Sequence, residues 1–201
     1  MALVKHNNNS ISDITSAGQL AQGKMTLISS QTASGSASIE FTTGIDSTYP
    51  IYRFEFINIH PQTDSVKFQF NLSTDGGSNY NVTKTTTMFR AYHGEADDGE
   101  DLVYKPDADL AQSTAFQILS EIGNDNDQCV SGELSIFSPS STIFVKHFMS
   151  NCNFVAPDNF SQNFRSAGYG NTTSSIDAVK FQMSSGNIDS GTIKLYGIKG
   201  D

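Results

Sequence analysis

Acidic side chains gather between Glu95 and Asp109, and they are the densest group of potential ligand or catalytic residues in the sequence. Clustered carboxylates suit hard cations, but the spacing here matches no defined calcium loop. A run of like charges is typical of a solvated loop held open by its own repulsion. We therefore predict a solvated acidic loop at residues 95–109 and keep calcium binding as the alternative. The oxygen-rich stretch at residues 124–127 is typical of a turn.

Catalysis by a nucleophile would need a histidine, serine or cysteine in a recognisable arrangement, and none occurs. The four histidines are His6, His60, His93 and His147. No Gly-x-Ser-x-Gly motif is present, and a glycosidase would need two carboxylates that face each other across a cleft. We predict a protein that is not an enzyme and that has no cofactor, no catalytic residues and no metal site.

The two cysteines, Cys129 and Cys152, lie 23 residues apart in the sequence. Their number and spacing do not suit a four-ligand zinc site. We predict free, mostly buried thiols and keep a disulfide between them as the alternative.

Charge and composition exclude several classes of function. The formal net charge of −9 disfavours nucleic acid and anionic membrane surfaces, because both are bound largely through Lys and Arg. No apolar run approaches the roughly 20 residues of a membrane-spanning helix, so we expect no membrane insertion. The N-terminus becomes polar before the core of a signal peptide could form, so we expect no export through a secretory route.

Strands are the elements that must position these residues. Only 37% of the residues are hydrophobic, and the remainder is rich in Ser, Thr, Asn, Gln and Gly, as in short strands joined by polar turns. Apolar and polar residues alternate with a period of two. The spacing of about nine or ten strands predicts an all-β, antiparallel β-sandwich, jelly-roll-like, over residues 25–201. The expected strands cover residues 37–42, 52–56, 66–72, 82–92, 115–119, 130–136, 142–149, 179–183 and 193–196.

Two of these strands predict the core directly. Phe54 and Phe56 alternate with charged residues in the first, and Phe68 and Phe70 alternate with polar residues in the second. Because alternate side chains of a strand lie on opposite faces, we predict that all four phenylalanines point inward.

Residues 1–24 differ from the rest of the chain. They are rich in Asn and Ser and have too few apolar residues to bury a core. We predict an extended N-terminal arm that docks onto another protein and becomes ordered there; a solvated tail is the alternative. The predicted docking residues are Leu3, Val4, Asn7, Ile11 and Ile14.

Four segments and the start of the chain carry a resemblance to a known family. The segments are residues 25–34, 56–61, 89–93 and 190–198, in that order, and the chain opens with Met-Ala-Leu-Val-Lys before an Asn-rich stretch. Together they resemble a widespread family of structural proteins of marine tailed phages, including cyanophages. The likeness covers nearly the entire chain. It implies a virion protein assembled in the bacterial cytoplasm, a tail-fibre or other appendage component whose partners are other virion proteins. It implies no catalytic residues.

Phage appendages are usually symmetric oligomers, so we expect a homotrimer, with exposed aromatics such as Tyr169 and Tyr196 as contacts. One alternative function is that of a capsid decoration or cement protein. Another is a carbohydrate-binding or carbohydrate-active protein that contacts a host surface glycan. The absence of Trp weighs against strong stacking on sugars, although seven Tyr could partly substitute.

Overall fold

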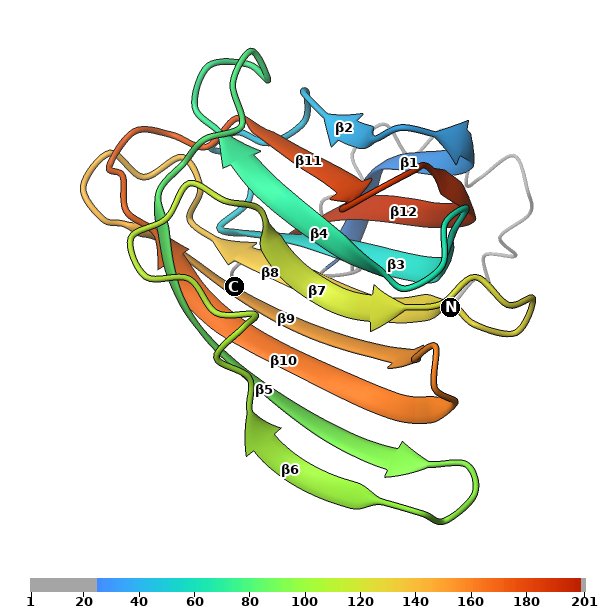
Figure 1. The fold of residues 1–201 in the computed structure, drawn as a ribbon. Helices are drawn as coiled ribbons and strands as arrows, with labels where there is room; N and C mark the ends of the chain where they lie inside the picture. The colour runs from blue at the N-terminus through green and yellow to red at the C-terminus, as the bar shows by residue number, and fades with distance from the viewer. Residues whose placement is uncertain (1–24, 200–201) are drawn as a thin grey trace, which may run out of the picture.

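The computed structural model describes residues 25–199, which form twelve strands and no helix. Hence no helix in this part of the chain could span a membrane. All strand pairs are antiparallel, and the strands form two sheets (Figure 1). The large sheet has the order β1 (Met25–Ser36), β12 (Ile188–Ile198), β3 (Ile51–Pro61), β8 (Val130–Phe137), β9 (Lys146–Val155), β10 (Phe160–Gly170), β5 (Lys84–Gly94) and β6 (Glu100–Tyr104). The small sheet has the order β2 (Ile39–Phe41), β11 (Ala178–Met183), β4 (Val66–Ser73) and β7 (Gln117–Ile122).

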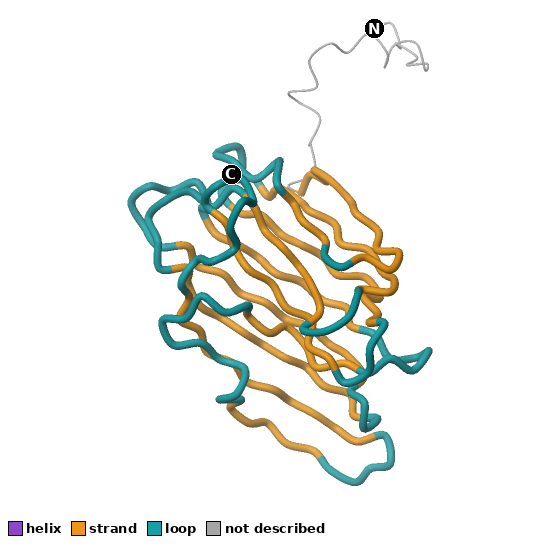
Figure 2. The backbone as a smooth tube through the Cα atoms, turned by 45° about the horizontal axis from the view of Figure 1, so that its top comes forward, coloured by secondary structure: helices purple, strands orange, loops and turns teal. Residues whose placement is uncertain are grey.

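The predicted β-sandwich is confirmed, and the chain crosses repeatedly between its two sheets. Strands β2, β4, β7 and β11 belong to the small sheet, and the strands that separate them in sequence belong to the large one. The small sheet covers only part of the large sheet, and β10, β5 and β6 continue beyond its last strand, β7 (Figure 1). Most connections lie at the two ends of the strands (Figure 2).

The core lies between the sheets and is rich in phenylalanine. The inward orientation predicted for Phe54, Phe56, Phe68 and Phe70 is confirmed, since none is more than 2% exposed. Phe181 of β11 lies among them and is completely buried. The Phe181 ring meets the rings of Phe54 and Phe56 edge to face, with 5.1 and 5.3 Å between ring centres, and such contacts add stability beyond that of burial alone.

The strand count was predicted too low, for three reasons that the structure makes clear. First, β10 was missed because most of its inward positions carry small or polar residues, and Phe164 alone is a large buried side chain within it. Second, residues 95–109 are not all loop, because Glu100–Tyr104 pairs with β5 as the edge strand β6. Third, β1 was not among the expected strands, because its residues are mostly exposed and Ala33 is its single buried residue. The apolar run at residues 142–149, which was expected to be strand throughout, is strand only from Lys146 onward.

The predicted cysteine state is confirmed in outline: both thiols are free, Cys152 is buried and Cys129 is half-buried. Burial raises the pKa of the Cys152 thiol to about 12, which keeps it protonated and unreactive. The predicted docking residues Leu3, Val4, Asn7, Ile11 and Ile14 lie outside the described residues.

Candidate binding pocket beside the edge of the small sheet

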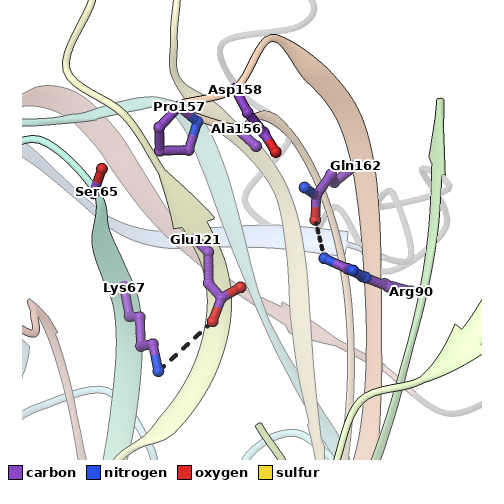
Figure 3. Close-up of a pocket in the computed structure, with 8 residues that line it drawn as sticks. All are labelled: Ser65, Lys67, Arg90, Glu121, Ala156, Pro157, Asp158 and Gln162. Atoms are coloured by element: carbon purple, nitrogen blue, oxygen red, sulfur yellow. Dashed lines mark hydrogen bonds and ion pairs between the residues drawn. The ribbon is translucent and has the colours of Figure 1, made fainter. Parts of the chain in front are cut away.

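A pocket of about 360 Å³ opens where the small sheet ends over the large sheet (Figure 3). Strands β4 and β7 supply one wall, and the inner face of β5 and β10 supplies the other. The turn between β9 and β10 closes one end. The pocket is lined by Ser65, Lys67, Arg90, Glu121, Ala156, Pro157, Asp158 and Gln162.

The first wall is held by a chain of ion pairs. Lys67 and Glu121 are direct cross-strand partners, and their charged atoms are 3.6 Å apart. The other carboxylate oxygen of Glu121 lies 3.1 Å from Nζ of Lys105, whose side chain is nearly buried. Lys105 also binds Asp107 at 2.8 Å, and its hydrogen bond keeps the pKa of Asp107 below the ordinary value. Glu121 is therefore held between two ammonium groups.

The second wall presents an arginine that is only partly used. The guanidinium of Arg90 lies over the ring of Tyr92, 4.7 Å from its centre, and Nη1 donates to Oε1 of Gln162 at 3.3 Å. The Nε–H group is buried and has no hydrogen-bond partner within residues 25–199. Arg90 makes no ion pair with any of these residues either. An unpaired buried donor costs about 1–3 kcal/mol, so this group lowers the stability of the fold locally.

The turn that closes the pocket is held firmly in place. The Asn159 amide donates to the carbonyl of Ala156 at 3.0 Å, and Asn159 adopts a positive φ of 62°. The buried side chain of Gln128 donates to the same carbonyl, at 3.4 Å. This anchoring places Pro157 and Asp158, both exposed, at the mouth of the pocket.

The pocket offers polar and apolar groups that a ligand could contact. The lining as described contains no histidine and no cysteine, and its only hydroxyl, that of Ser65, donates to the neighbouring Asp64 on the exposed surface. Its polar groups are a guanidinium, an ammonium, an amide and two carboxylates, and Ala156 and Pro157 form an apolar patch beside them.

A second hollow, of about 470 Å³, lies on the outer face of the large sheet. Its polar part contains an ion pair between Arg53 and Glu133, at 3.2 Å, and Arg165. Exposed apolar side chains surround it and continue to the sheet edge. They are Met149, Phe89, Leu102 and Tyr104.

The residues that the sequence marked for chemistry do not converge. Within residues 25–199 no group of three or more His, Cys, Asp or Glu side chains is placed to hold a metal ion. In the acidic stretch, Asp109 accepts a hydrogen bond from the Tyr104 hydroxyl at 2.5 Å, and Asp97 pairs with His93 at 3.2 Å. The stretch at residues 124–127 lies in a turn and loop, as predicted.

Sequence reasoning missed Arg90 and Gln162, although Arg90 lies in a segment that carries the family resemblance. The available signal was an arginine at an inward position, in phase with Met88 and Tyr92. Comparison with protein-family models, with curated proteins and with solved structures finds no match to this chain.

Proposed function

We propose that this protein is a non-enzymatic structural component of a tailed-phage virion, a tail-fibre or other appendage protein built on a jelly roll. The observation that carries the proposal is the path of the chain. The small sheet has the order β2-β11-β4-β7, and the chain returns to the large sheet after each of its strands. This alternation suits a jelly roll in which β3, β8–β10, β5 and β6 form the facing sheet. Jelly rolls recur in viral coat proteins and lectins.

A fold alone does not define a function, so the proposal also needs support from the surface of the protein and from its sequence. The four segments that carry the resemblance to phage structural proteins lie in β1, β3, β5 and β12, which all belong to the large sheet. The surface also carries exposed apolar side chains that a neighbouring virion protein would cover. Two of them, Ile143 and Phe144, lie at the loop between β8 and β9 and are 74% and 70% exposed.

A second copy of the chain is the proposed partner of the outer edge patch, defined as Phe89, Leu102 and Tyr104. Phe89 and Tyr104 are cross-strand neighbours, and the three side chains are 44–66% exposed on the edge of the large sheet. Edge strands and apolar patches of this kind favour association. Tyr169 and Tyr196, named from the sequence as exposed contacts, are half-buried, so the outer edge patch replaces them in the proposed homotrimer.

Residues 1–24 are the proposed attachment to the virion, as their sequence suggests. The test of the whole proposal is the number of copies in purified phage particles, measured by quantitative mass spectrometry against the major capsid protein. An appendage component is expected at tens of copies for each particle. Hundreds of copies would establish a capsid decoration protein instead, and absence from particles would refute both assignments.

A further inference from the structure

A buried lysine and a buried asparagine meet where the chain passes from the small sheet to the large one. Lys84, at the start of β5, and Asn71, near the end of β4, are both completely buried. Nζ of Lys84 donates to Oδ1 of Asn71 at 2.5 Å and to the carbonyl of Val82 at 2.8 Å. Among the described residues, no carboxylate forms an ion pair with Lys84. Burial without an opposite charge favours the neutral form of the amine.

A neutral lysine amine is a nucleophile, and the carbonyl group nearest to it is that of the Asn71 side chain. Burial lowers the pKa of Lys84 to about 7, so an appreciable share of its side chain is unprotonated at neutral pH. A carbonyl bond is about 1.23 Å long, which places Cγ of Asn71 within about 3.7 Å of Nζ. Reacting atoms about 3–3.5 Å apart are close to attack, so a small shift of the lysine side chain brings the two atoms within reach.

The side-chain amide of Asn71 is held at both ends by hydrogen bonds. The Leu72 N–H group donates to Oδ1 at 2.9 Å, which is the atom where negative charge develops when the carbonyl is attacked. Nδ2 donates to the main-chain carbonyls of Tyr80, at 2.7 Å, and Thr114, at 2.9 Å. Both of these residues lie in loops, and Thr114 is exposed, so a nitrogen that leaves from this position leaves towards the surface.

We propose that Lys84 and Asn71 join through an intramolecular amide bond, with the release of ammonia. The lone pair of Nζ attacks Cγ of Asn71, and Oδ1 takes up the negative charge, which the Leu72 N–H group stabilises. A proton passes from Nζ to Nδ2, the Cγ–Nδ2 bond breaks, and Nδ2 leaves as ammonia. The products are one secondary amide and one ammonia, so the step consumes no other reactant. With a single oxyanion donor and a direct proton transfer the reaction is slow, and freshly purified protein is expected to contain free Lys84.

The bond ties β4 of the small sheet to β5 of the large sheet and closes the loop between them. Like a disulfide, such a cross-link restricts the unfolded chain, and for a loop of this length it is expected to raise the melting temperature by about 6–12 °C. Because a linked Lys84 no longer titrates, any pH dependence of stability that comes from this lysine belongs to the unlinked chain. The inference goes beyond the proposed function and does not depend on it.

The test follows the intact mass of the freshly purified full chain during incubation at about pH 8.5, above the pKa of Lys84. The linked chain is lighter by one ammonia, and its share is expected to increase with time. Trypsin should no longer cleave it after Lys84, so that residues 68–90 remain one closed peptide. A mass that stays constant over a week would overturn the proposal, and so would cleavage after Lys84 in the lighter species.

Three variants identify the atoms that react. Lys84→Arg removes the amine, so a loss of ammonia that persists in this variant would come from a cyclic imide of Asn71 alone and would overturn the proposal. Asn71→Asp keeps the carbon that is attacked but releases water, so its linked form is expected to be lighter by one water molecule. Lys146→Arg is the matched control. Lys146 is also completely buried, but its Nζ donates to the main-chain carbonyls of Ser141 and Phe144, and the loss of ammonia is expected to be unchanged.

Discussion

Removal of the Phe181 ring is expected to be among the most damaging single changes in the core. Phe181 is completely buried, and its ring lies close to the rings of five other phenylalanines from β2, β3 and β4. The distances between ring centres run from 5.1 to 6.3 Å, and the neighbours are Phe41, Phe54, Phe56, Phe68 and Phe70. The side chain thus joins the small sheet to β3 of the large one.

Phe181→Ala combines the loss of buried apolar surface with a cavity that these rings cannot fill without moving. Truncation of a buried Phe costs about 3–5 kcal/mol, and each lost aromatic pair adds about 0.5–1.5 kcal/mol at most. Because these terms overlap, we expect a loss of about 4–5 kcal/mol in the free energy of unfolding. For a chain of this length that lowers the melting temperature by about 8–20 °C.

The assay is urea unfolding followed by circular dichroism, with a thermal scan as a second measurement. Phe144→Ala is the matched control, because the same ring is deleted at a position that is 70% exposed. The control is expected to change stability by no more than about 0.5 kcal/mol. A loss below about 1 kcal/mol for Phe181→Ala, with an unchanged m-value, would refute the assignment of this cluster as the joint between the sheets.

Three further predictions concern a buried charge, the arm and the interface. Burial lowers the pKa of Lys84 to about 7, so between about pH 7 and pH 10.5 the unfolded chain holds a proton that the folded chain has lost. The wild type should therefore gain stability relative to Lys84→Met as the pH rises from 7 to 9.5. Equal pH profiles of the two proteins in urea unfolding would contradict this. Deletion of residues 2–20 should leave the thermal transition of the β-domain nearly unchanged but abolish its incorporation into particles, and truncated protein found at normal copy number would exclude the docking arm. Leu102→Asp in the outer edge patch should convert a trimer to a monomer, as measured by light scattering. The control is Thr26→Asp, on β1 at the opposite edge of the large sheet. A wild-type monomer at micromolar concentration would exclude the trimer in solution.

The amino-acid sequence by itself determined the class of fold and much of the core. Alternation with a period of two is a local property, so Phe54, Phe56, Phe68 and Phe70 could be assigned to the inner face without knowledge of strand order. Strands with few large inward residues escaped the same reasoning, as β10 shows. In β6 the charges of Glu100 and Asp101 concealed an edge strand, where exposed charge is tolerated and even useful.

Only the tertiary structure decided which distant residues share a site. Lys67, Arg90, Glu121 and Gln162 come from four strands, β4, β5, β7 and β10, and no local pattern links them. Their meeting depends on strand order and on how far the small sheet extends over the large one. The acidic residues at 95–109, adjacent in sequence, were instead spread over a loop and an edge strand, because a strand turns successive side chains to opposite faces. Proximity along this chain was therefore a poor guide to proximity in space.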